Sequence, residues 1–145
     1  MSSVVGKSVL RPAGVWDPAK AGFEHPQPFS QGIVCDAGQM LFTAGQVALS
    51  EDGTVIGAGD PSAQTEAALD NLQRVLAEGG ATLSDVVRLT VFLTDMAQLP
   101  AVQEVRARYF PVDPPASSTI GISALVLPEL MVEIDAIAVL EAPVR

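Results

Sequence analysis

The feature that most constrains the fold is the alternating run from Leu130 to Leu140, in which Glu133 and Asp135 are separated by apolar residues. Successive side chains of a β-strand point to opposite faces, so both carboxylates share one face and the apolar residues share the other. Such a strand belongs in a sheet that has one face packed on a core and the other face carrying polar groups.

Signals for helices and further strands surround this run. Asp60-Pro61 predicts the start of a helix, because Asp can cap and Pro fits the first helical position, and Gly79-Gly80 predicts its end. A second helix is predicted after Asp95, with Pro111 stopping it. The predicted order is ββαβαββ, with strands at 29–36, 40–49, 86–94, 116–123 and 130–140. This order predicts an α+β domain, a mixed sheet with two helices on one face.

The amino-terminal segment differs from the rest of the chain. Residues 1–28 are rich in Pro, Gly and small residues without a sustained period, which predicts an arm that builds little of the core. The domain itself is predicted to span residues 29–145. Within it, the short connection Ala37-Gly38-Gln39 suits a hairpin between the first two strands.

Composition and charge narrow the class of protein. With 145 residues, 48% hydrophobic and 17% charged, the chain fits one packed domain. No uncharged apolar run reaches the roughly 18 residues of a membrane span, and no secretory signal is readable, so we expect a cytoplasmic protein without a membrane partner. The net charge is −9 and the basic residues are scattered, so we expect no nucleic acid partner.

The single cysteine and the single histidine limit the chemistry. Cys35 alone excludes an internal disulfide and a multi-cysteine zinc site within one chain. It is interpreted as a small buried strand residue. A nucleophilic pair of Cys35 with His25 is a weaker alternative, because His25 lies between prolines in a predicted loop.

Several motifs occur in one register from about Pro28 to Leu140. They include Pro28-Phe29-Ser30-Gln31-Gly32, Leu41 to Val47, Thr90 to Met96, Pro114 to Ile120 and Val132 to Ala138. Together they closely resemble the Rid family of reactive-intermediate deaminases, also called YjgF-like proteins. The resemblance implies a chorismate-mutase-like subunit, a homotrimer, and a small-molecule ligand in a cleft between neighbouring subunits. It implies hydrolysis of imines or enamines to keto acids and ammonia, with no cofactor and no metal.

Three site residues follow from the resemblance. The family glutamate that positions or activates water corresponds to Glu133, the cleft glycine to Gly45, and the aromatic lid residue, usually Tyr, to Phe29. Other interpretations stay open: Glu133 as a solvated strand carboxylate or an interface acceptor, and Phe29 as a plain core residue.

The family arginine that holds the substrate carboxylate corresponds to Ser117, and two further cleft positions correspond to Gln103 and Thr119. Ser117 and Thr119 also fit small strand residues without a ligand role. Arg106 and Arg108 are interpreted as covering the outer face of the second helix, with the alternative that Arg106 reaches the cleft and replaces the lost cation. A serine hydroxyl cannot reproduce the paired hydrogen bonds of a guanidinium, so altered substrate recognition is expected.

The leading hypothesis is a divergent Rid-type hydrolase of a small imine, enamine or related labile nitrogen compound. In it Glu133 orients water, and Ser117 and Thr119 bind the ligand. The competing hypothesis is a non-catalytic trimeric ligand-binding or chaperone-like protein on the same fold. Ribonuclease activity, sometimes attributed to relatives, fits poorly with an acidic chain that has one histidine.

Overall fold

The structure, a computed structural model, describes residues 6–20 and 26–141. The element order within them is β1 (Lys7–Leu10), β2 (Gly32–Cys35), β3 (Gln39–Phe42), β4 (Gln46–Val47), α1 (Pro61–Glu78), η1 (Leu83–Asp85), β5 (Val86–Leu93), η2 (Met96–Gln98), α2 (Leu99–Tyr109), β6 (Ala116–Gly121) and β7 (Val132–Leu140).

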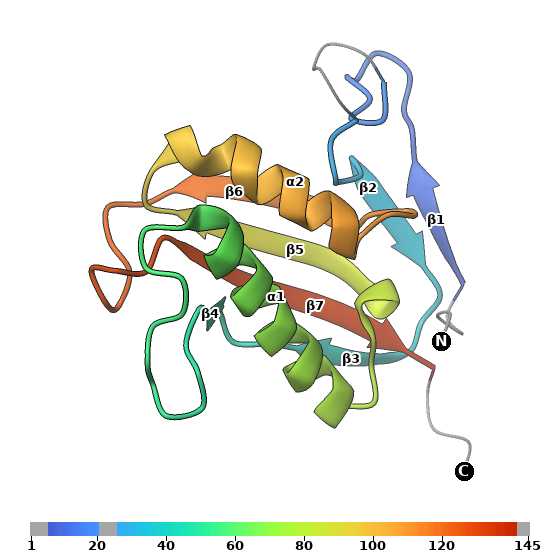
Figure 1. The fold of residues 1–145 in the computed structure, drawn as a ribbon. Helices are drawn as coiled ribbons and strands as arrows, with labels where there is room; N and C mark the ends of the chain where they lie inside the picture. The colour runs from blue at the N-terminus through green and yellow to red at the C-terminus, as the bar shows by residue number, and fades with distance from the viewer. Residues whose placement is uncertain (1–5, 21–25, 142–145) are drawn as a thin grey trace.

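β7, the alternating strand, is the centre of the main sheet. It pairs antiparallel with β5 on one side and with β3 and β4 on the other. β6 pairs in parallel with β5 at the edge, which gives the order β3-β7-β5-β6 (Figure 1). The predicted α+β class is confirmed, because parallel and antiparallel pairs occur in one sheet and both helices pack on it.

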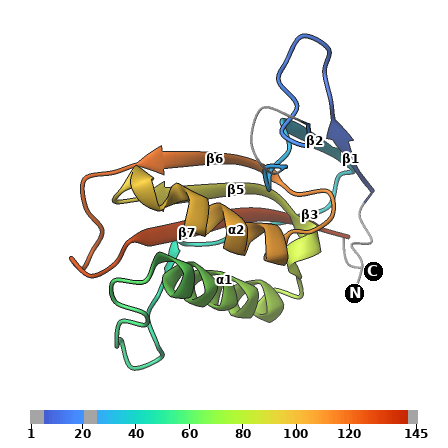
Figure 2. The same cartoon turned by 45° about the horizontal axis from the view of Figure 1, so that its top comes forward.

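The two helices lie on the same face of this sheet, as Figure 2 shows. α1 begins as the sequence predicts, with the Asp60 carboxylate accepting a hydrogen bond of 3.1 Å from the Ala63 N–H. Between helices and sheet lies one apolar core. Its fully buried members come from both helices and from the two central strands and include Leu69, Leu72, Val102, Val91 and Ile134.

The predicted hairpin between the first two strands is wrong. β2 pairs with β1, whereas β3 pairs with β7, starting at Gln39 opposite Leu140. Gly38 lies where the chain passes the end of β7, and a Cβ there would overlap the carbonyl oxygen of Leu140. The predicted strand 40–49 is also interrupted, because β3 ends at Phe42 and β4 begins at Gln46.

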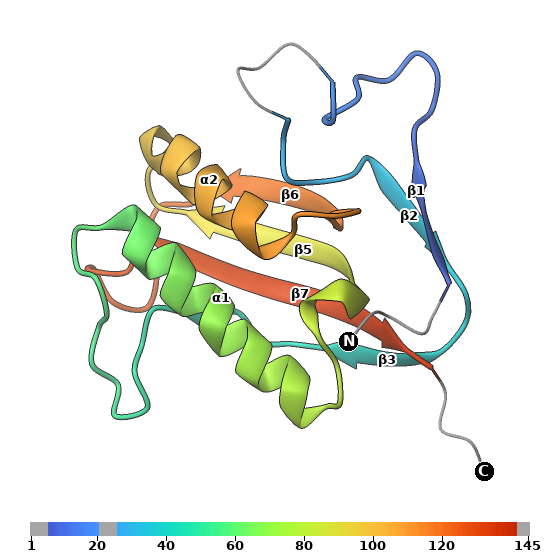
Figure 3. The same cartoon turned by 45° about the vertical axis from the view of Figure 1, so that its right-hand side comes forward.

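The amino-terminal arm contains a strand that the sequence pattern did not reveal. β1 and β2 form a separate two-stranded ribbon, which stands apart from the main sheet in Figure 3. Lys7 ties this ribbon to the body, since its Nζ donates a 2.8 Å hydrogen bond to the carbonyl of Ser84. The described part of the segment 1–28 therefore adds a strand beside the main sheet and supplies no member of the main core cluster.

The second face of the sheet is not covered by the described residues. Glu133 and Asp135 point to it and the buried Val132 and Ile134 point to the helices, which confirms the predicted alternation. Large apolar side chains are also exposed on this face, among them Phe42 at 66%. No helix within the described residues is long and apolar enough to cross a bilayer.

Candidate active site

Arg106 is the least expected feature of the site, because its side chain is 0% exposed. One guanidinium nitrogen, Nη1, donates to Gln103 Oε1 at 2.7 Å and to Thr119 Oγ1 at 3.5 Å. The other, Nη2, donates to Ser117 Oγ at 2.8 Å and to the Pro28 carbonyl at 3.4 Å. A guanidinium from α2 thus joins three residues that the sequence analysis placed in one cleft.

The interpretation of both arginines as outer-face residues is therefore wrong for one of them. Arg108 does lie on the outer face, where its side chain is 59% exposed and contacts Glu66 Oε1 at 2.7 Å. Arg106 points to the sheet because it follows the buried Val102 by four residues and so shares its face.

The surroundings of Arg106 are polar but uncharged. Among residues 6–20 and 26–141, its four hydrogen-bond acceptors are neutral, and Nε has no partner. Burial lowers the pKa of Arg106 to about 10, so the guanidinium still carries its charge at neutral pH. A buried cation that lacks a counter-ion is unfavourable, and neutral acceptors compensate for only part of the lost hydration.

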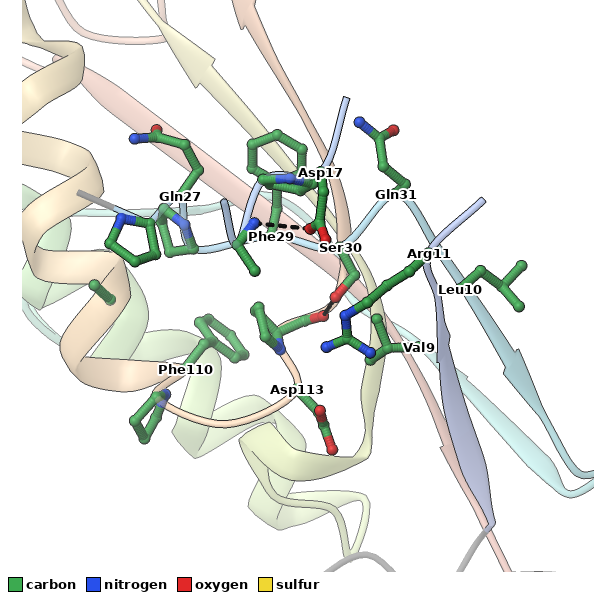
Figure 4. A pocket seen from close by; sticks show the side chains of 17 residues that line it. Val9, Leu10, Arg11, Asp17, Gln27, Phe29, Ser30, Gln31, Phe110 and Asp113 are labelled. Atoms are coloured by element: carbon green, nitrogen blue, oxygen red, sulfur yellow. Dashed lines mark hydrogen bonds between the residues drawn. The ribbon is translucent and has the colours of Figure 1, made fainter. Parts of the chain in front are cut away.

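Phe29 follows the Pro28 carbonyl and lines a hollow of about 280 Å³ between the arm and the end of α2 (Figure 4). Its ring lies 5.9 Å from that of Trp16, centroid to centroid, in a tilted arrangement. Arg11, Asp17 and Asp113 also line this hollow. Phe29 is half-buried and forms a wall next to the Arg106 site.

Gly45 and Glu133 form a second group. A Cβ added at Gly45 would overlap Oε1 of Glu133, so only glycine allows the carboxylate to lie directly against the backbone. The loop that carries Gly45 is held on β7 by Thr43, whose N–H donates to the Ala136 carbonyl at 3.0 Å and whose Oγ1 accepts from the Ala136 N–H at 3.0 Å. Asn71 holds β4 itself through 2.9 Å hydrogen bonds to the carbonyls of Val47 and Leu49. Within the described residues, Glu133 is half-buried and no hydrogen bond or ion pair is formed by its carboxylate.

The two groups lie on opposite faces of the sheet. Thr119 is in register with Val91 of the core, so its side chain faces the helices. Glu133 is in register with Phe92, one residue later on β5, so its side chain faces the open side. Within one chain, therefore, the glutamate and the guanidinium cannot act on the same small molecule.

The structure describes one member of the alternative nucleophilic pair. Cys35 lies in β2 and is half-buried, and His25 lies outside the described residues. Among the residues that the structure describes, His, Cys, Asp and Glu side chains form no cluster of three that could hold a metal ion.

Sequence reasoning missed the Pro28 carbonyl and Gln27. Gln27 Oε1 accepts a hydrogen bond of 3.4 Å from Gln103 Nε2, and so extends the polar network around Arg106 towards the arm. A backbone acceptor has no sequence signature, but the spacing of Arg106 from Val102 was a usable signal.

The chain is an α+β subunit with two helices on one face of a mixed sheet, and the candidate site residues lie on both faces of that sheet. A family model described as Endoribonuclease L-PSP matches residues 21–140. This chain therefore belongs to the YjgF/Rid family.

Individual relatives agree with this assignment. Protein DfrA of Myxococcus xanthus is 46% identical over 112 residues, which cover 77% of this chain and 85% of DfrA. The crystal structure of YyfB from Yersinia pestis, of the conserved Rid protein family, superposes with a TM-score of 0.81 at 39% identity over 92% of this chain and 98% of that chain. The crystal structure of yeast Mmf1 superposes with a TM-score of 0.68 at 26% identity, over 94% of this chain and 100% of Mmf1.

Proposed function

We propose that this protein hydrolyses a small imine, enamine or related labile nitrogen compound, without a cofactor, in a cleft between neighbouring copies of a homotrimer. The observation that carries this proposal is the contact of Gly45 with Glu133. It leaves a carboxylate beside open backbone, with its oxygens not engaged by any described residue. Such a carboxylate can hold and deprotonate a water molecule.

The proposed chemistry needs no group beyond this carboxylate and water. The water oxygen adds to the carbon of the C=N bond while Glu133 accepts one of its protons. That proton passes to the nitrogen, which gives a carbon bearing one hydroxyl and one amino group. The C–N bond then breaks, ammonia leaves with the hydroxyl proton, and a carbonyl compound remains.

We propose that several copies assemble because one chain does not bring the Glu133 carboxylate and the Arg106 guanidinium together. Glu133 faces the open side of the sheet, and Arg106, Ser117, Thr119 and Gln103 face the helix side of the edge strand β6. The open face exposes Phe42 at 66%, Met40 at 56% and Ile120 at 44%. An apolar face of this kind favours burial against another copy. A cleft would then take Glu133 from one copy and Arg106 from the next.

A test uses imines generated in situ by an amino acid oxidase, with ammonia release as the readout. Glu133→Gln should lower turnover by about 10²- to 10⁴-fold, the usual loss on removing a general base. Glu129→Gln is the matched control, since Glu129 is exposed in the loop before β7 and should keep full turnover. Unchanged turnover in Glu133→Gln would contradict the proposed role.

The competing function, a non-catalytic ligand-binding or chaperone-like trimer, predicts no ammonia release from any imine by the wild type. Cleavage of RNA, suggested by the description of the family model, predicts activity that stays constant through successive purification steps. The net charge of −9 and the uncharged partners of Arg106 do not favour a phosphate-backbone site.

A further inference from the structure

The buried Arg106 guanidinium on α2 forms no ion pair with any residue that the structure describes. The one ion pair formed among the described residues joins Arg108 and Glu66 on the outer face, away from Arg106. Arg106 is 0% exposed, and its Nε–H is directed at no acceptor. Position in the last turn of α2 is favourable for a cation, but this does not supply the missing acceptor.

The hydrogen bonds around the guanidinium are unequal. Those to Gln103 and Ser117, at 2.7 and 2.8 Å, are short, whereas the one to the Pro28 carbonyl is 3.4 Å long. Nε and Nη2 form one edge of the planar group, and a carboxylate binds such an edge through two parallel hydrogen bonds. On this edge, Nε has no partner among the described residues, and Nη2 donates to Ser117 Oγ at 2.8 Å and to the Pro28 carbonyl at 3.4 Å.

We infer that Arg106 determines ligand specificity by binding a carboxylate of the ligand through the Nε/Nη2 edge, in place of the Pro28 carbonyl. Gln103 and Ser117 hold the other donors and fix the plane of the guanidinium. This inference rests on the proposed function for the nature of the ligand, but it concerns recognition and not the reaction. It extends the alternative of the sequence analysis in which Arg106 reaches the cleft and replaces the cation of the family arginine.

A purely structural role for Arg106 is the alternative. The same hydrogen bonds tie α2 to β6 and to the segment around Pro28. A structural clamp would affect stability but would not distinguish a charged ligand from a neutral one of the same shape. Charge selectivity therefore separates the two roles.

The experiment measures binding of 2-oxobutanoate and of its neutral analogue 2-butanone by calorimetry, using the full chain. The wild type should bind the carboxylate more tightly than the ketone. In Arg106→Met the affinity for the carboxylate should fall about 30-fold or more, as expected for truncating one partner of a buried charge pair, with the ketone little changed. Arg108→Met, two residues further along the same helix, is the matched control and should bind like the wild type.

Arg106→Lys covers the case in which Arg106→Met does not fold. It keeps the charge and loses the paired geometry, so it should retain selectivity for the carboxylate with weaker affinity. Equal binding of both ligands by the wild type, or unchanged carboxylate affinity in a folded Arg106 variant, would overturn the inference. Glu133→Gln separates this result from the proposed function, because it should keep carboxylate binding while losing turnover.

Discussion

The two faces of the main sheet differ in how they position a charged side chain, Arg106 on the helix side and Glu133 on the open side. On the helix side, Arg106 is fully enclosed and surrounded by neutral acceptors. On the open side, Glu133 is half-buried, lies against Gly45, and has no described partner. The enclosed cation is fixed in orientation by four hydrogen bonds, whereas the carboxylate is positioned mainly by the absence of a side chain at residue 45.

This difference suits the two groups to different roles, ligand recognition for Arg106 and activation of water for Glu133. A group held rigidly by neutral neighbours is suited to recognition, because its geometry is set before the ligand arrives. A carboxylate with free oxygens is suited to handling water. The following predictions test whether the two faces have these separate roles.

The largest effect is expected at Gly45. In Gly45→Ala the new Cβ would displace the Glu133 carboxylate, so turnover should fall about 10²-fold, as for a reacting group moved by about 1 Å. Steady-state ammonia release checks this.

The affinity of the same variant for 2-oxobutanoate is its internal control, because Arg106 lies on the other face of the sheet. Full turnover in Gly45→Ala would show that the close contact with Glu133 is not needed for the reaction.

Ser117→Arg should have the next largest effect, on stability. A second guanidinium would take the place of the Ser117 hydroxyl that Arg106 now contacts at 2.8 Å, which places two cations in one buried site. We expect the free energy of unfolding to fall by about 2 kcal/mol or more, measured by urea denaturation.

Two further variants test whether charge repulsion causes the loss of stability in Ser117→Arg. Ser123→Arg, in the exposed loop after β6, should leave stability nearly unchanged. The double variant Arg106→Met with Ser117→Arg should recover most of the loss, because one cation remains. A destabilisation that the double variant does not relieve would point to steric overlap instead of charge.

The smallest expected effect is on the pH dependence of carboxylate binding. The pKa of Arg106 is lowered to about 10, which still leaves the cation protonated at lower pH, and none of its hydrogen-bond partners titrates. Affinity should therefore stay within about 2-fold between pH 7 and 9 and decline only above about pH 10. A steep loss between pH 7 and 9 would assign binding to a different cation.

Much of the fold could be predicted from local sequence. The alternation in β7, the Asp60 cap and the prolines after α2 depend on near neighbours, and each acts as expected. The pairing of β3 could not be predicted, because its partner β7 lies nearly at the other end of the chain and a short glycine connection is compatible with a hairpin or with a crossing.

The candidate site, like the fold, could be predicted from the sequence only in part. Motif positions predicted Glu133, Gly45 and the residues around Arg106 as candidates, but motif order carries no information about which face of the sheet each residue occupies. The burial of Arg106 depends on contacts between α2, β6 and the Pro28 backbone, which only the folded chain brings together.

The central claim, that a complete site takes one group from each of two copies, is tested most directly by mixing two impaired variants at a low substrate concentration. Glu133→Gln should lose turnover and Arg106→Met should bind substrate weakly, and after joint refolding about a quarter of the clefts should combine an intact glutamate with an intact arginine. Ammonia release well above that of either variant is the predicted result. Mixed assemblies that form but stay inactive would contradict the account.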